Sequence, residues 1–262
     1  MIISVTSPAN QRLKVSRQLH SRSAILKNGL FLMEGPKFVS DQLERSLPEW
    51  ILLSVDAGEE VRGLAGRIVS LGVDVLELPA GLFKSVSDTE TSQGIISVLS
   101  LPAADVQILP RRGFFLLLDG VSDPGNMGTI LRSAAAFGCA AVITGPGSCF
   151  PFIPKVTRAA AGLNGSITLA CDVDLPGFMR ENGSEMEFAG ADTEGDDPGT
   201  LRGRRDCLGL VIGSEAHGIS GPVEALLDFK VAIPMTGGVE SLNAAVSASI
   251  LLYEASRGNA GV

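Results

Sequence analysis

The sequence predicts an α/β protein with two domains, a C-terminal domain built on a parallel sheet and a smaller α/β domain before it. Two unbroken apolar runs, FFLLL and LGLVI, suit strands buried on both faces, as in a parallel sheet covered by helices. Strand and helix patterns alternate along the chain. The stretch LPAADVQILPRR at 101–112 carries two prolines and is typical of an interdomain linker.

The predicted division is a first domain at residues 1–103 and a second at 104–262. A length of 262 residues agrees with two domains of ordinary size. In the first domain, the patterns predict helices at 10–21 and 36–45, and strands at 31–33, 51–54, 73–77 and 95–99. Strands and helices alternating over such short lengths predict a small α/β sandwich.

In the second domain, the predicted strands are 114–118, 140–144, 166–170, 186–189, 208–212 and 229–233. Helices are expected between them, and the clearest helix is the last, at 241–256. A sheet of this kind binds ligands at the carboxyl ends of its strands. Functional residues are therefore expected in the loops that follow the strands.

Composition is that of a folded globular protein, with 45% hydrophobic and 19% charged residues. No apolar run approaches the roughly 20 residues that a membrane-spanning helix needs, and residues 1–10 lack the layout of a secretion signal. We therefore expect a cytoplasmic protein with no membrane partner. The four cysteines include no CxxC pair, so we expect no metal site.

The overall charge argues against a nucleic-acid partner, because the net charge is −8 and the pI is about 4.9. The distribution of charge along the chain, in contrast, is compatible with a nucleic-acid partner. Residues 1–33 contain no acid, and phosphate contacts need a basic surface only locally. Ordinary solvated helix charges are the alternative interpretation. The basic residues of this stretch are Arg12, Lys14, Arg17, Arg22 and Lys27.

The first unusual loop lies in LDGVSDPGNMGTILRSAAAFG, at 118–138. Asn126 suits a helix N-cap, whose side-chain oxygen accepts a bond from a backbone N–H of the first turn. Arg132 is the one charged residue between 127 and 137. Its guanidinium fork suits phosphate or ribose oxygens, whereas the alternative is an arginine solvated on the exposed face of the helix.

The second loop lies in LGLVIGSEAHGIS, at 208–220. Gly213 comes straight after a predicted strand and Gly218 follows five residues later, so the backbone can approach a flat ligand closely. Glu215, between the two glycines, is expected either to bind a ligand or an RNA group, or to accept hydrogen bonds from amides of its own loop. We assign no role to His217.

The third loop lies in VAIPMTGGVESLNAAVSASILLYEASR, at 231–257, and contains a Gly237-Gly238 turn. Ser241 suits the N-cap of the last helix. Asn243 would then lie inside that helix, where asparagine is unfavourable and a functional reason is expected.

Motifs of other enzyme classes are missing or incomplete. The sequence contains no GxxxxGK[ST], HExxH or GxSxG. Gly145 and Gly147 follow a predicted strand, but Phe150 stands where the third glycine of a dinucleotide fingerprint belongs. This argues against a nicotinamide-dependent enzyme.

Together, the segments NMGTILRSAAAFG, GSEAHGIS and IPMTGGVESLNAAVSASILLYE resemble, in order and spacing, the three signature motifs of SpoU (TrmH) RNA methyltransferases of the knotted SPOUT superfamily. The segments VTSPANQRLKVSRQLHSR, FLMEGPKFV and SVSDTETSQGIISVL resemble the L30e-like substrate-binding domain of that family. Ala216 and Ser247 replace a frequent glycine and a common alanine, and both residues are small.

This resemblance implies a C-terminal domain threaded into a deep trefoil knot, whose pocket binds S-adenosylmethionine. It implies that the donor-binding residues are Gly213, Ile233 and Leu242. It implies a homodimer formed through the helices of the knot, in which Arg132 serves the partner subunit's pocket. The implied active-site residues are Asn126, Arg132, Glu215, Ser241 and Asn243.

The implied reaction is methyl transfer to a ribose 2′-hydroxyl of RNA, for which positioning is the main requirement. The family assigns the activation of the hydroxyl to the arginine of the first motif. A guanidinium, with a pKa above about 12, is a poor base, so we expect Arg132 to anchor a neighbouring phosphate instead. Then that phosphate oxygen or a water takes the proton.

The two-domain layout resembles the ribosomal RNA enzymes of the family, so the expected substrate is 23S ribosomal RNA. Transfer RNA is one alternative substrate. A protein that binds RNA and the methyl donor without catalysis is another reading of the sequence. The presence of both Arg132 and Asn243 argues against this binding protein without catalytic activity.

Overall fold

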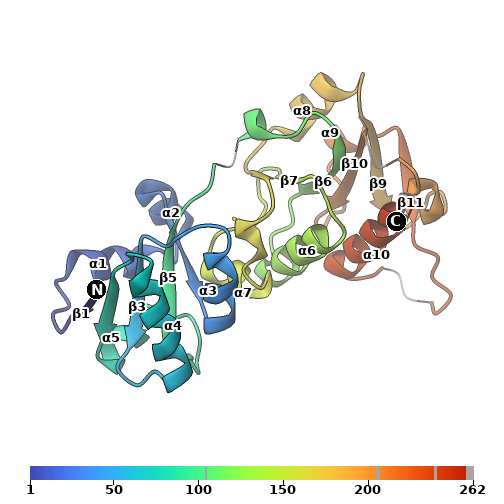
Figure 1. The fold of residues 1–262 in the computed structure, drawn as a ribbon. Helices are drawn as coiled ribbons and strands as arrows, with labels where there is room; N and C mark the ends of the chain where they lie inside the picture. Colours follow the sequence, from blue (N-terminus) through green and yellow to red (C-terminus); the bar gives the residue numbers. More distant parts are fainter. Residues whose placement is uncertain (104, 205–206, 239–240, 258–262) are drawn as a thin grey trace. The chain divides into compact units, whose positions relative to one another are not determined.

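The computed structural model describes residues 1–103, 105–204, 207–238 and 241–257 (Figure 1). These residues pack as two compact units. The first unit combines Met1–Pro102 with Pro151–Gly162, and the second combines Ala103–Phe150 with Leu163–Val262. A short segment from the C-terminal half of the sequence therefore packs with the N-terminal unit.

The first unit contains a five-stranded mixed sheet in the order β1-β4-β3-β5-β2. The strands β1, β4 and β3 are parallel, whereas β5 is antiparallel to both β3 and β2. The strands are β1 (Ile2–Ser4), β2 (Leu30–Glu34), β3 (Trp50–Ser54), β4 (Val75–Leu78) and β5 (Ile95–Ser100). The helices are α1 (Gln11–Gln18), α2 (Arg22–Asn28), α3 (Pro36–Leu43), α4 (Glu59–Ser70), α5 (Ala80–Lys84) and α7 (Pro154–Ala159).

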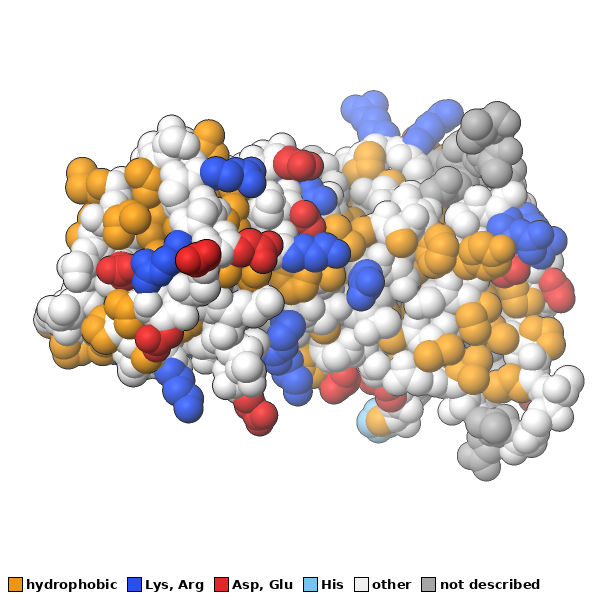
Figure 2. Space-filling view, turned by 60° about the horizontal axis from the view of Figure 1, so that its bottom comes forward, with side chains coloured by type: hydrophobic (Ala, Val, Ile, Leu, Met, Phe, Trp, Pro, Cys, Tyr) orange, Lys and Arg blue, Asp and Glu red, His pale blue; other side chains and the backbone are white. Residues whose placement is uncertain are grey.

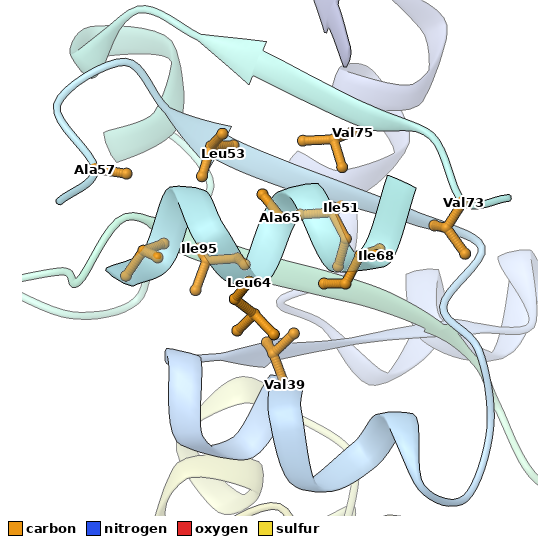
Figure 3. Close-up of a cluster of buried hydrophobic side chains, with 11 residues drawn as sticks. Val39, Ile51, Leu53, Ala57, Leu64, Ala65, Ile68, Val73, Val75 and Ile95 are labelled. Carbon is orange, nitrogen blue, oxygen red and sulfur yellow. The ribbon is translucent and has the colours of Figure 1, made fainter. Parts of the chain in front are cut away.

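Helices α3 and α4 cover one face of this sheet, where their apolar side chains meet those of the strands (Figure 3). Leu64 and Ile68 of α4 pack with Ile51 and Leu53 of β3. Because neighbouring residues of a strand point to opposite faces, Trp50 points to the other side. There its ring Nε1 donates to Ser16 Oγ of α1 at 3.2 Å, so α1 covers the opposite face.

The helix predicted at 10–21 is wrong in its extent, because two helices occupy this region. The first, α1, ends at Gln18, and Ser21 caps α2 by accepting a bond from the Ala24 amide at 3.3 Å. A serine that can cap a new helix competes with continuation of the old one. The sequence patterns also did not predict β1, α4 or α5.

The second unit contains a six-stranded sheet in the order β11-β9-β10-β6-β7-β8, and all its strand pairs are parallel. The prediction of a parallel-sheet C-terminal domain is therefore confirmed. The strands are β6 (Gly113–Asp119), β7 (Ala141–Thr144), β8 (Leu169–Ala170), β9 (Glu187–Asp192), β10 (Cys207–Gly213) and β11 (Phe229–Ala232). The strand predicted at 166–170 is thus reduced to two residues.

The apolar runs that predicted β6 and β10 are buried, as strands covered on both faces require. On one face, Phe115, Leu117 and Val211 pack with Met179 of α8 and Val223 of α9. Helix α10 contacts β10 and packs against α6 (Figure 1), and the Ser133 and Ser249 hydroxyls lie 2.7 Å apart. The helices of this unit are α6 (Pro124–Ala136), α8 (Leu175–Asn182), α9 (Gly221–Glu224) and α10 (Ala244–Ser256), with 3₁₀ turns η1 (Val106–Ile108), η2 (Leu163–Gly165) and η3 (Pro198–Leu201).

Candidate active site

The candidate site lies at the carboxyl ends of β6 and β10, where the order of the strands along the sheet reverses. From β6 the chain moves outward to β7 and β8, and it later returns to build β9, β10 and β11 on the other side. The last residues of the two central strands, Asp119 and Gly213, are register partners. A parallel sheet binds ligands at such a switch point.

The loop after β10 is a tight turn closed by its own backbone. The Ser214 amide donates to the Gly218 carbonyl at 3.0 Å, and the Gly218 amide donates back to the Ser214 carbonyl at 2.9 Å. The Ser220 amide donates to Asp119 Oδ2 at 2.7 Å, which ties the end of the turn to β6. A Cβ atom on Gly213 would lie 2.2 Å from the Gly218 carbonyl carbon, so this approach needs glycine.

A cavity of about 460 Å³ opens beside this turn. The three residues predicted to bind the donor, Gly213, Ile233 and Leu242, all line it, and so do Glu215 and Ser241. Its volume lies within the range of about 300–1,000 Å³ that is usual for small-molecule sites. The wall also includes residues that the sequence patterns did not select, and these are Ala191, Asp192, Thr193, Ile212, Ser214, Ile219, Glu224, Val231, Met235, Ala244 and Leu251.

The prediction that Asn126 caps a helix is wrong. Helix α6 begins at Pro124, and its N-cap is Asp123, whose Oδ1 accepts a bond from the Asn126 amide at 2.8 Å. An acidic residue followed by proline at the first helical position is a recognised start signal, so Asp123 could have been found from the sequence. The side chain of Asn126 is thereby free for other partners.

The cap of the last helix is also different from the prediction. Helix α10 begins at Ala244 instead of Ser241, and Asn243 is its N-cap. The Asn243 Oδ1 accepts bonds from the amides of Ala245 at 3.0 Å and Val246 at 3.3 Å. Asparagine is a preferred residue at an N-cap. The expectation that Asn243 lies inside the helix, and needs a functional reason to be there, is therefore wrong.

Three predicted residues from the three loops form one chain of hydrogen bonds. The Asn126 Nδ2 donates to Glu215 Oε1 at 2.5 Å, and the Asn243 Nδ2 donates to Asn126 Oδ1 at 3.0 Å. Asn126 is the central member and uses both ends of its amide. This Glu215–Asn126–Asn243 bridge fixes the start of α6, the turn after β10 and the start of α10 relative to one another.

Arg132 is not brought to this bridge. It lies six residues after Asn126 in α6, which is about 240° around the helix axis. Its side chain is exposed, does not line the cavity, and has no hydrogen bond or ion pair with the residues that the structure describes. Within one chain, Arg132 and Asn126 therefore point in different directions.

A group of charges stands at the rim of the cavity. Lys230 of β11 donates to Asp192 Oδ2 at 2.8 Å and also bonds to Glu224. The bond from Lys230 lowers the pKa of the Asp192 carboxyl below its ordinary value of 3.8, and bonds to Asp192 and then Glu224 raise the pKa of the Lys230 ammonium. The lysine thus clamps the end of β9 to the end of α9.

The basic residues predicted to face RNA do not all remain available. Arg12 forms an ion pair with Asp74 at 2.8 Å, and this bond lowers the pKa of the Asp74 carboxyl below 3.8. Lys14 and Lys27 are exposed. On the face shown in Figure 2, lysine and arginine side chains stand among acidic ones, and no single large basic area is seen.

The described part of the chain contains no group of three or more His, Cys, Asp or Glu side chains arranged to hold a metal ion. Among the same residues, no helix has both the length and the apolar character needed to cross a membrane.

The chain matches two family models. Residues 113–253 match the SpoU rRNA Methylase family, and residues 10–97 match the MRM3-like substrate binding domain. The first match contains the residues that line the cavity, the three residues of the bridge, and Arg132.

The chain is similar to two curated methyltransferases of 23S ribosomal RNA. It is 30% identical to the 23S rRNA (guanosine(2553)-2′-O)-methyltransferase of Bacillus subtilis, over 95% of this chain and 97% of that protein. It is 31% identical to the 23S rRNA (uridine(2479)-2′-O)-methyltransferase of Streptomyces viridochromogenes, over 91% and 86%. Among solved structures, it matches the SpoU methyltransferase AviRb of that organism in complex with AdoMet, with a TM-score of 0.85, 27% identity, and coverage of 96% and 99%.

Proposed function

Because this chain belongs to the SpoU rRNA methylase family, we propose that it transfers a methyl group from S-adenosylmethionine to a ribose 2′-hydroxyl of 23S ribosomal RNA. One observation carries the proposal. The cavity and the Glu215–Asn126–Asn243 bridge join all three signature segments at the carboxyl ends of β6 and β10. The two relatives described above, which are 2′-O-methyltransferases of 23S ribosomal RNA, support the choice of RNA.

The cavity suits S-adenosylmethionine. The missing side chain of Gly213 lets the turn after β10 pack closely against the end of that strand, beside the cavity, and the apolar side chains of Ile233 and Leu242 offer surfaces for a flat base. The carboxylates of Asp192 and Glu224 at the rim suit a ligand that carries positive charge and hydroxyl groups. When bound, the donor supplies a methyl group attached to a positively charged sulfur.

The residues of the chain act mainly by holding groups in place. The bridge holds Glu215, which lines the cavity, against Asn126, so that a ribose hydroxyl meets fixed polar groups. Ser241 lines the same cavity and offers a hydroxyl there. In this proposal Arg132 anchors the neighbouring RNA phosphate through its guanidinium fork, and the hydroxyl proton passes to that phosphate oxygen or to a water.

We further propose that the enzyme is a homodimer. Arg132 points away from Asn126 of its own chain, so a complete site needs an arginine from a second copy. Helix α10 offers a surface for that copy, because Val246 and Tyr253 are 47% and 48% exposed although the helix also has a buried side. A helix that is apolar all round is normally covered on every side.

The division of labour that we propose follows the two family models. Residues 1–103 bind the RNA and residues 104–262 carry out the transfer. We also propose that the C-terminal segments of the second domain are threaded through a knot, which is consistent with the loops after β9, β10 and β11 all lining one cavity. An enzyme of 23S ribosomal RNA would work in the cytoplasm.

The test uses 23S ribosomal RNA transcribed in vitro and a donor with a labelled methyl group. The wild-type protein should label ribose 2′-oxygens in this RNA and not in transfer RNA. Arg132→Ala should abolish labelling while calorimetry still shows donor binding. Arg180→Ala, which removes an exposed cation from α8, is the control and should retain activity. Donor affinity lost in Arg132→Ala would contradict the role assigned to this residue.

A further inference from the structure

A loop of the first unit, residues 85–94, is held by one acidic side chain. Glu34, at the end of β2, accepts hydrogen bonds on Oε1 from the hydroxyls of Ser87, Thr89 and Ser92, at 2.6, 2.7 and 2.6 Å. Its Oε2 accepts a bond from the Asp88 amide at 3.1 Å. Four donors from one loop therefore converge on a single carboxylate.

This arrangement makes the loop stiff. Hydrogen bonds to a charged group are stronger than those between neutral groups, so four such bonds hold the loop firmly against Glu34. Each hydroxyl has one proton to donate, and the three hydroxyls bonded to Oε1 use that proton in the hydrogen bond to the carboxylate. Positive charges attached to this loop are thus held in fixed places.

Two arginine side chains are bonded to the first part of the loop, at Ser85 and Asp88. The Arg17 Nε of α1 donates to Ser85 Oγ at 2.7 Å. The Arg158 Nη1 of α7 donates to the Asp88 carbonyl at 3.1 Å and to its carboxylate at 2.7 Å. No bond of Arg158 Nε or Nη2 to another described residue is seen, so that side of its guanidinium can take a further acceptor.

Three exposed lysines flank these arginines. Lys84 directly precedes the loop. Lys14 lies three residues before Arg17 on α1, and Lys155 lies three residues before Arg158 on α7, so each shares a helix face with its arginine. The resulting basic strip consists of Lys14, Arg17, Lys84, Lys155 and Arg158.

We propose that this basic strip, stiffened by Glu34, is the surface on which the first unit binds the RNA sugar-phosphate backbone. The inference rests on the proposed function and deepens it. A fixed row of cations in a protein of net charge −8 supplies the local basic surface that phosphate contacts require. Two of the cations come from α7, which lies outside the matched substrate-binding region 10–97.

The proposal also changes which basic residues matter. The sequence pointed to all five basic residues before Met33, but Arg12 pairs with Asp74 instead of bonding to the loop at 85–94, and it lies over the Trp50 ring, 5.7 Å from its centre. The strip keeps Lys14 and Arg17 from that group. It adds Lys84, which precedes the loop in the sequence, and Lys155 and Arg158, which only the folded chain brings to that loop.

The first experiment measures the salt dependence of binding to 23S ribosomal RNA transcribed in vitro. The variant Lys84→Gln/Lys155→Gln removes two cations that have no bonds to other described residues, so the loop should stay folded. Removing two phosphate contacts should lower the slope of log affinity against log salt by about 1.5. The control is Arg45→Gln/Arg67→Gln, two exposed cations after α3 and on α4, the helices that cover the opposite face from α1. Its slope should match that of the wild type.

The second experiment tests Glu34 as a positioning residue. Glu34→Gln removes a negative charge, so charge alone would make RNA binding tighter. Loss of the loop anchor should instead weaken binding several-fold, with the donor affinity unchanged in calorimetry. Tighter or equal binding by Glu34→Gln would overturn the role of Glu34.

The outcomes separate this inference from the proposed function. If the wild type methylates 23S ribosomal RNA and the lysine variant keeps the wild-type slope, the strip is refuted while the proposed function stands. If the slope of the lysine variant is lower than that of the wild type by the expected amount, but the wild type labels none of this RNA, the strip stands and the proposed function fails.

Discussion

Exchanging the two partners of the central hydrogen bond tests whether the Glu215–Asn126–Asn243 bridge acts by geometry. In Asn126→Asp, the amide that donates to Glu215 at 2.5 Å becomes a second carboxylate. The lost bond to a charged group is worth about 1.5–3 kcal/mol. Repulsion between two exposed carboxylates at this separation adds about 1 kcal/mol in a water-like environment. The bond from Asn243 can remain, because the new side chain still accepts it.

The expected total is about 2.5–4 kcal/mol, and each 1.4 kcal/mol corresponds to a factor of ten. The rate of methyl transfer in a single turnover should therefore fall about 100- to 1,000-fold. The Kd for the donor should change much less, because Asn126 does not line the cavity. Calorimetry with the donor and a single-turnover assay with labelled donor and 23S ribosomal RNA separate the two effects.

The double variant Asn126→Asp/Glu215→Gln restores a donor and an acceptor with their direction reversed. If the bridge works by geometry, this variant should recover activity to within about tenfold of the wild type. Glu215→Gln alone is the matched control, and it should lose about tenfold because a neutral acceptor replaces a charged one. An inactive double variant that folds and binds the donor normally would refute the reasoning, since Glu215 would then be needed as a carboxylate.

Three further predictions concern the walls of the cavity and its rim. Gly213→Ala would place a methyl carbon 2.2 Å from the backbone of the adjoining turn, so donor affinity should fall at least 100-fold by calorimetry, whereas Gly221→Ala, in open space, should bind normally. Asn243→Ser keeps an N-cap oxygen for α10 but removes the amide of the bridge, so thermal stability should stay within about 1 kcal/mol while methyl transfer falls at least tenfold in the labelling assay. Lys230 lowers the pKa of the Asp192 carboxyl below 3.8, so the stability from this pair is present above that pH and is lost as the pH falls through the lowered value. Asp192→Asn should therefore lose less thermal stability than the wild type between about pH 6 and about pH 3, and an equal loss would contradict the assignment.

Much of the C-terminal domain could be predicted because the signals are local. The runs at 114–118 and 208–212 are apolar at every position, and such short runs are typical of strands buried on both faces. Gly213 follows the second run directly, and the structure shows a backbone approach that needs glycine there. Neighbours along the chain carry this information, so periodicity and turn residues were sufficient.

Helix starts were predicted less well, because several residues near each start can serve as a cap. Asp123 and Asn126 both suit the start of α6, and Ser241 and Asn243 both suit that of α10. The structure selects Asp123 and Asn243. The choice depends on how the preceding loop enters the helix, which is a property of the packed chain.

The site itself was decided only by the tertiary structure. Asn126 and Glu215 are 89 residues apart in the chain, and Asn126 and Asn243 are 117 apart, so no local pattern predicts that their side chains bond. The segment Pro151–Gly162 likewise packs with the first unit, where Arg158 meets Asp88. The sequence alone determined which strands are buried and where glycine is required, because those properties depend on neighbouring residues. Which distant side chains meet depends on the order of strands in the sheet, and only the folded chain sets that order.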